Sequence, residues 1–156
     1  MNPVTPSTTP PPRGVRGWLL VLCVVMTGVG PVISAWLMAE EYAAAAPYFA
    51  GSGLVLAVFV GTLVATGAAV AYGMHAGLRL WRVRPGAVST AKNVLLFGLA
   101  VDVVSAAVHT AMGPVAESGW ALRGGLTTSL LPGLVFFTLC FAYLNRSARV
   151  QATYAV

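Results

Sequence analysis

The residues of this chain that could take part in chemistry are few, and the sharpest lies in the apolar stretch 93–112. Asp102 comes ten positions after Lys92, so a helix carries it about 15 Å inward, near the centre of a bilayer. An aspartate at that depth costs roughly 2.5–3.5 kcal/mol on insertion scales. We therefore predict that Asp102 faces other helices rather than lipid. With no Lys or Arg in any apolar stretch to pair with it, we predict that it is often protonated and donates a hydrogen bond.

Other polar residues at comparable depth suggest a polar cluster around this carboxyl group. Ser105 follows three positions later on the same helix face, and Thr27 lies at similar depth on another helix. We predict that Asp102, Ser105 and Thr27 cluster. His109 is seven positions beyond Asp102, about 10.5 Å along the axis and too far for direct contact. Two interpretations stay open: a proton relay through water or another helix, or a tie between helices at Asp102 with His109 at the outer interface.

The sequence lacks the motifs of known catalytic and metal sites. It has no P-loop, no HExxH, no paired CxxC, no GxSxG and no Rossmann glycine pattern. Cys23 and Cys140 lie in apolar runs and are interpreted as small core residues. We therefore predict a protein that is not an enzyme, with no catalytic residues, no metal and no cofactor.

The elements that must position these residues follow from composition. Hydrophobic residues make up 58% of the 156 residues and charged residues 8%, whereas soluble domains carry about 25% charge. A soluble globular protein and a disordered chain are both excluded. We predict an all-α, polytopic integral membrane protein with four transmembrane helices in a compact bundle. The predicted spans are about 17–39, 54–76, 93–112 and 124–145, between a disordered Pro-rich tail (1–16) and a short basic tail (146–156). Pro31 and Pro132 are predicted to kink the first and fourth spans.

The lipid bilayer is the expected partner of this chain, and the few basic residues predict the orientation of the chain in it. Eight of the nine lie in the two terminal segments and in the loop between the second and third spans, whereas the first loop carries only Glu40 and Glu41. The positive-inside rule then places both termini in the cytoplasm. Because the basic residues form no continuous stripe, we do not expect nucleic-acid binding.

The second span has small residues at every fourth position, which let another backbone approach closely. Each four-residue step drifts by about 40° around the helix, so one straight partner cannot use the whole series. We predict that it serves two neighbours at different depths, and we favour ordinary bundle packing over a dedicated dimer motif. A membrane-protein partner or a second copy remains open. The packing residues are Gly61, Ala65, Ala69, Gly73 and Gly77.

Both ends of the chain carry recognisable patterns. The first is G-x-x-G-W-L, with Gly17 and Trp18, and the second is an aromatic residue, then Ser-x-Arg-Val-x-x-Thr and an aromatic residue. The second pattern contains Tyr143, Ser147, Arg149, Val150, Thr153 and Tyr154. Together they resemble a bacterial membrane-protein family catalogued as domain of unknown function 2569, although Ala148 and Gln151 replace its usual basic residues. The resemblance implies a small bacterial inner-membrane protein and brings no known activity.

The tail pattern also has a physical interpretation of its own. Arg146 and Arg149 could meet anionic headgroups just outside the membrane, while Ser147 and Thr153 could organise a turn or cap a short segment. We favour a topology anchor over a docking motif.

Two hypotheses for function follow. The first is a non-enzymatic accessory or interaction subunit, based on short loops, absent motifs and the small-residue series. The alternative is a small transporter or channel component, proton-linked through Asp102, based on the mid-membrane carboxylate and two proline-broken helices.

Overall fold

The computed structural model describes residues 17–112 and 130–154, and these form helices with no strand among them. The first long rod joins α1 (Trp18–Val24), a π-helical segment η1 (Val25–Val29), α2 (Gly30–Ala45) and a 3-10 turn η2 (Ala46–Tyr48). Two long helices follow, α3 (Gly53–Trp81) and α4 (Ala87–Met112). The remaining helices are α6 (Leu131–Arg146) and the short α7 (Ala148–Tyr154). The all-α prediction is confirmed for the described residues.

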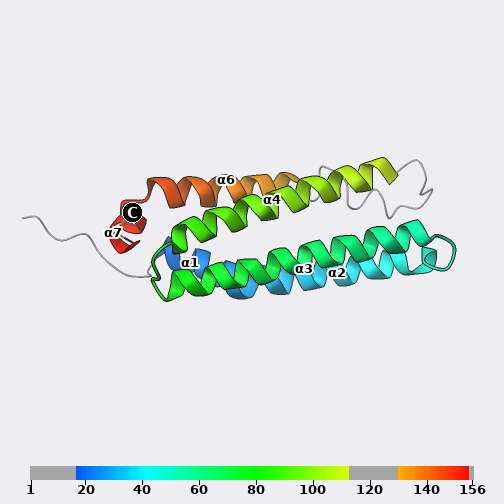
Figure 1. The fold of residues 1–156 in the computed structure, drawn as a ribbon, viewed down its shortest axis with the longest axis horizontal. Helices are drawn as coiled ribbons and strands as arrows, with labels where there is room; N and C mark the ends of the chain where they lie inside the picture. Colours follow the sequence, from blue (N-terminus) through cyan, green and yellow to red (C-terminus); the bar gives the residue numbers. More distant parts are fainter. Residues whose placement is uncertain (1–16, 113–129, 155–156) are drawn as a thin grey trace, which may run out of the picture.

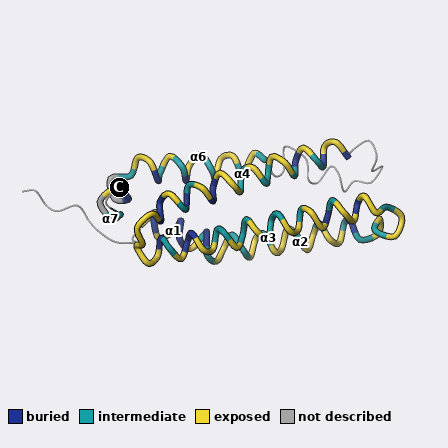
Figure 2. Tube along the Cα trace, viewed as in Figure 1, coloured by how far each residue is buried: buried dark blue, intermediate teal, exposed yellow. Residues whose placement is uncertain are grey.

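Three of these helices are long and apolar enough to cross a membrane: the rod Trp18–Tyr48, then α3, then α4. The shortest has 26 residues and is about 39 Å long, against a hydrocarbon core of ~30 Å. Large apolar side chains such as Val32 and Val64 are more than 60% exposed, and exposed positions follow the length of α2, α3, α4 and α6 (Figure 2). Such surfaces suit lipid rather than water. Residues 124–129 of the predicted fourth span lie outside the described residues, so the four-span count stays a prediction.

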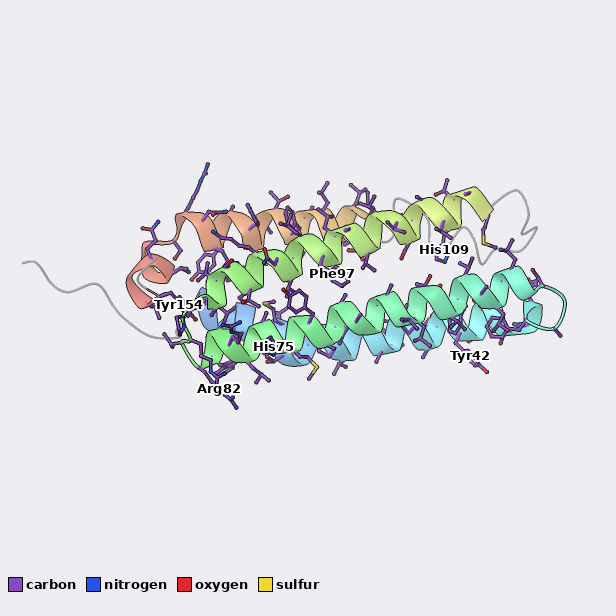
Figure 3. All side chains as sticks on the ribbon, viewed as in Figure 1. Tyr42, His75, Arg82, Phe97, His109 and Tyr154 are labelled. Atoms are coloured by element: carbon purple, nitrogen blue, oxygen red, sulfur yellow. The ribbon has the colours of Figure 1, made fainter. Side chains whose placement is uncertain are left out.

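The helices pack in chain order. The α1–α2 rod lies against α3, α3 against α4, and α4 against α6. The start of α1, the turn between α3 and α4, and α7 all lie at one end of the molecule, which we call the terminal end (Figure 1). Figure 3 shows Arg82 and Tyr154 at this end, and Tyr42 and His109 toward the opposite, far end.

Several charged positions that the sequence predicts in loops lie within helices. Glu40 and Glu41 were assigned to a loop, but both are helical residues of α2, which continues without interruption to Ala45. Lys92 was also assigned to a loop and lies instead within α4, which begins at Ala87. The physical reason is that hydropathy marks where an apolar run stops, whereas a helix stops where capping or a breaker ends its hydrogen bonds. Ser52 is such a cap: its hydroxyl accepts the Val55 N–H at 3.4 Å and starts α3.

The predicted interruption at Pro31 takes the form of the π-helical segment just before it. The Gly30 N–H donates to the carbonyl of Val25, five residues back instead of four. A Cβ on Gly30 would lie 2.8 Å from that carbonyl oxygen, so this turn needs glycine. Pro132 lies in the first turn of α6 as described.

The turn from α3 to α4 is braced by one arginine. The guanidinium of Arg79 donates to the hydroxyl of Thr90 at 3.2 Å and to the carbonyl of Pro85 at 3.1 Å. The chain reverses through positive φ angles at Val83 (48°) and Gly86 (73°). Arg79 therefore joins the two sides of the turn, a role beyond orientation.

The larger apolar core lies at the terminal end and joins both ends of the chain. Leu19 of α1, Leu80 of α3 and Val150 of α7 are almost completely buried in it. Gly17 begins α1 with a φ of 62°, which favours glycine, and its carbonyl accepts the N–H groups of Leu20 and Val21. The pattern Gly17-Trp18-Leu19 thus combines a helix cap with positive φ, an exposed indole and a core residue.

The tail pattern is positioned by three contacts. The hydroxyl of Ser147 accepts the Val150 N–H at 3.5 Å, which caps α7, and Val150 enters the core. The Tyr154 hydroxyl donates to the carbonyl of Leu80 at 2.7 Å. Burial raises the pKa of Tyr154, which keeps this hydroxyl protonated. The tail pattern therefore docks α7 onto its own chain, while its role as a topology anchor stays a prediction.

Candidate functional site

Asp102 lines a cavity of about 240 Å³ in the middle of the helices. The walls come from η1, α2, α3, α4 and α6, so every long helix contributes. Of the eighteen lining residues only three have polar side chains: Ser34 of α2, Thr66 of α3 and Asp102 of α4. Asp102 thus faces neighbouring helices, as its insertion cost requires.

The carboxylate of Asp102 lies directly over α6. A Cβ built on Gly133 would stand only 2.6 Å from its Oδ2 atom, so glycine makes room for the carboxylate. Within the described part of the chain, Asp102 forms no hydrogen bond or ion pair. A half-buried carboxylate that lies beside an open space and has no partner is typical of a group that binds a ligand. A group that only ties helices together would be hydrogen-bonded.

The irregular backbone of the first rod borders the same cavity. Gly30, Pro31 and Ser34 line it, one turn beyond the π-helical segment. Pro31 removes one amide donor, and π-helical turns recur at functional sites. The carboxylate of Asp102 and the irregular turn of the first rod are therefore parts of one site.

The structure does not bring the other predicted cluster members to this carboxylate. The Thr27 hydroxyl donates to the carbonyl of Cys23 at 2.8 Å, and its methyl group faces Gly77. Ser105 lines a second hollow, between α3 and α4. Neither side chain is hydrogen-bonded to Asp102 among the described residues.

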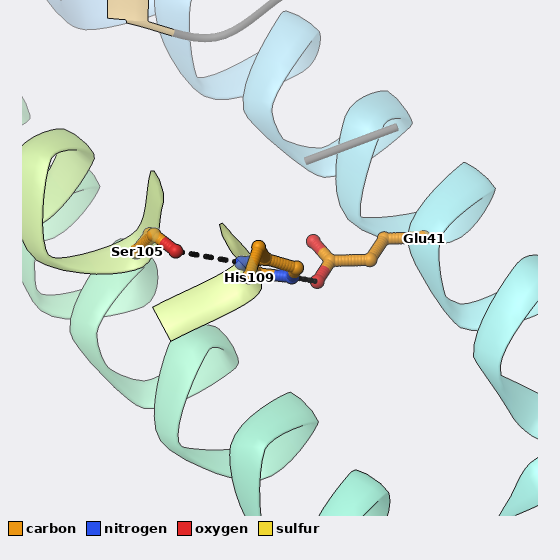
Figure 4. A network of polar contacts seen from close by, with 3 residues as sticks. All are labelled: Glu41, Ser105 and His109. Atoms are coloured by element: carbon orange, nitrogen blue, oxygen red, sulfur yellow. Dashed lines mark hydrogen bonds and ion pairs between the residues drawn. The ribbon is translucent and has the colours of Figure 1, made fainter. Parts of the chain in front are cut away.

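His109 is buried, and it pairs with a residue that the sequence analysis did not select. Its Nε2 atom lies 3.1 Å from Oε1 of Glu41, and its Nδ1 atom lies 2.8 Å from the Ser105 carbonyl (Figure 4). The side chains of His109 and Glu41 are 4% and 19% exposed, respectively. The ring thus faces α2 across the helix interface. The two interpretations of His109 given above stay predictions.

Two of the contacts of His109 indicate where its protons lie. A carbonyl oxygen only accepts, so Nδ1 carries a proton and donates to Ser105. The short contact with Glu41 needs one further proton between Nε2 and Oε1. The pair is either imidazolium with carboxylate or imidazole with carboxylic acid, and it has no net charge in both forms. This neutrality suits a contact near the end of two apolar helices.

Aromatic rings lie beside this pair at the far end. Tyr42, Phe49 and Phe59 form a mutual cluster with ring centroids 5.4–5.9 Å apart. Phe59 also belongs to a small core with Ala45 and Met112. Among the described residues, this aromatic cluster and the His109–Glu41 pair both contribute to holding the far end together.

The small-residue series on α3 divides between neighbours, as expected for its drift around the helix. A Cβ on Gly77 would clash with Thr27 at 2.5 Å, and one on Gly73 would touch Val94 of α4 at 3.8 Å. Ala69 lines the Asp102 cavity. Gly61 and Ala65 instead line the second hollow, and a Cβ on Gly61 would meet nothing within 4 Å.

No family model, no curated protein and no solved structure matches this chain. The resemblance to domain of unknown function 2569 therefore stays a prediction.

Proposed function

We propose that this chain is a non-enzymatic subunit of a bacterial inner-membrane assembly, and that it holds a transmembrane helix of a partner protein against α3 and α4. The observation that carries this proposal is a groove of about 450 Å³ between these helices, which we call the α3–α4 groove. Its lining residues are Val58, Gly61, Thr62, Ala65, Phe97, Ala100, Val101, Val104, Ser105 and Val108.

The chemistry of the α3–α4 groove favours an uncharged helix as its occupant. None of the lining residues is ionisable, and Gly61, Ala65 and Ala100 leave backbone within reach of a neighbour. Close approach of backbones is how helices associate in lipid, which offers no hydrophobic drive between them. The groove also continues the small-residue series that already packs against other helices at Gly73 and Gly77. Gly61 and Ala65, the part of the series that lines the groove, are thus suited to the same kind of helix contact.

The proposal can be tested by photo-crosslinking in native membranes. A photoreactive side chain at Ala65, inside the groove, should give one discrete adduct with a partner protein. The matched control is Val64, the adjacent position on the same helix, which is 66% exposed and is not a lining residue of the groove. The adduct at Ala65 should disappear when Gly61→Leu fills the groove.

Three results would contradict this function. One is equal crosslinking at positions 64 and 65, and another is an adduct that persists in Gly61→Leu. The third is an adduct with the mass of two copies of this chain, which would assign the groove to self-association instead.

We also propose that both chain ends face the cytoplasm. The support is the distribution of basic residues, eight of nine on one side, together with the common terminal end of α1 and α7 (Figure 1). The test uses a reporter that is active only in the cytoplasm. It should be active when fused after Val156 and inactive when inserted between Gly51 and Ser52. The reverse pattern would overturn this orientation.

A second candidate function is a small transporter or channel component. It is favoured by the Asp102 cavity, where a carboxylate in mid-membrane adjoins a broken helix, a combination found at transport sites.

A further inference from the structure

The Asp102 cavity has the composition of a ligand site rather than of a packing defect. Voids left by imperfect packing are apolar and stay dry, whereas this one contains a carboxylate with no partner among the described residues. Its volume of about 240 Å³ is below the range of drug-sized ligand pockets and far above that of one water molecule. A small molecule therefore fits it.

Charge balance selects the sign and valence of that molecule. Asp102 is the only ionisable residue among the eighteen that line the cavity. A monovalent cation beside it makes a neutral pair, whereas an anion or a divalent cation would leave a net charge in low dielectric.

The walls select an organic cation over a metal ion. Metal cations that bind oxygen prefer about six ligands, and the side chains here offer one carboxylate and two hydroxyls, those of Ser34 and Thr66. The other fifteen lining residues have apolar side chains or are glycine. Among them Phe136 and Phe137 follow Gly133 by three and four positions on α6, so their rings share the face that the carboxylate contacts. Aromatic faces attract alkylammonium groups.

We propose that the Asp102 cavity binds a small monovalent alkylammonium cation, with Asp102 as the counter-ion and the α6 aromatic rings against its alkyl groups. The site shares only Val101 with the lining of the α3–α4 groove, and it gives the transport candidate a ligand class. Binding of the cation and protonation of Asp102 exclude each other, because both use the same carboxylate. Affinity therefore falls as the pH is lowered.

The test is a binding measurement with tetraethylammonium on the purified full chain in detergent micelles, with empty micelles as the blank. Equilibrium dialysis should show saturable binding of about one cation per chain. The apparent affinity should decrease on acidification, and an equal concentration of Na⁺ should not displace the bound cation.

Two variants with different chemistry keep the test informative. Asp102→Asn removes the charge and should weaken binding at least tenfold. Gly133→Ala keeps the charge but places a methyl group where the carboxylate lies, and should also weaken binding. The matched control is Gly67→Ala on α3, whose added Cβ meets nothing within 4 Å and which does not line the cavity. Helicity and elution volume in all variants show that they are folded.

The proposal is overturned by binding that never saturates, by unchanged binding in Asp102→Asn with folding intact, or by equal displacement with Na⁺. Uptake of tetraethylammonium into liposomes is measured separately. Saturable binding without uptake would support the cation site and contradict the transport function. Absence of the crosslink at Ala65, with cation binding intact, would contradict only the helix-binding function.

Discussion

Glu41→Ala is expected to destabilise the helix bundle by about 2 kcal/mol, the typical contribution of a hydrogen bond to a charged group in a buried setting. The change removes the carboxyl group of α2 that lies 3.1 Å from Nε2 of His109, whose side chain is 4% exposed. Unfolding by a denaturing detergent in mixed micelles, followed by helicity, measures the difference.

The conservative variant separates the hydrogen bond from the charge. In Glu41→Gln the amide group can donate to Nε2 while Nδ1 still donates to the Ser105 carbonyl. We therefore expect Glu41→Gln to lose less than about 1 kcal/mol. A loss as large as that of Glu41→Ala would mean that the ionic form of the pair is required.

The adjacent acidic residue provides the control for this experiment. Glu40 is on the same helix, has the same side chain and is exposed. Glu40→Ala should change stability by no more than about 0.5 kcal/mol, as surface substitutions do. If Glu40→Ala and Glu41→Ala were equally destabilised, the contact with His109 would contribute nothing specific.

Gly77→Ala is the second large effect, with an expected cost of about 1–3 kcal/mol from overpacking. The new methyl group would stand 2.5 Å from Cγ2 of Thr27 and 3.2 Å from Cβ of Met26. Thr27 cannot easily turn away, because it is β-branched and its hydroxyl is hydrogen-bonded to Cys23. The α3 helix and the π-helical segment must therefore separate.

Two further variants make this prediction sharp. Thr27→Ser removes the clashing methyl group, so the double variant with Gly77→Ala should recover part of the lost stability. Gly67→Ala adds the same methyl group to the same helix in open space and should be neutral or stabilise by up to about 1 kcal/mol. Equal losses at positions 67 and 77 would show that helix propensity, not the contact with η1, sets the cost.

Some features of the site could be read from the sequence because a large energy enforces them. An aspartate in mid-membrane has to face protein, and Asp102 lines a cavity among the helices. The drift of the small-residue series likewise follows from helix geometry, and Gly73 and Gly77 do meet different neighbours.

Other features depend on details that a regular helical pattern does not contain. Thr27 lies within the π-helical segment, whose extra residue rotates side chains away from the face that a 3.6-residue period assigns them. Glu41 and His109 are 68 positions apart, and hydropathy placed Glu41 in a loop because it does not reveal where a helix ends. One signal was present: no residue between Ala39 and Ala46 breaks a helix.

The docking of α7 sets an order for assembly of the bundle. Leu19 and Val150 share one core but are 131 positions apart in the chain. At 5–20 residues per second, the ribosome needs between about 7 and 26 s to make the intervening segment. During that time the first helix is in the bilayer while its inner surface still lacks part of its cover. The terminal end is therefore completed only after α7 has been made, and a nascent chain cut short before Ser147 is distinguishable from a finished one by an uncovered apolar surface at this end.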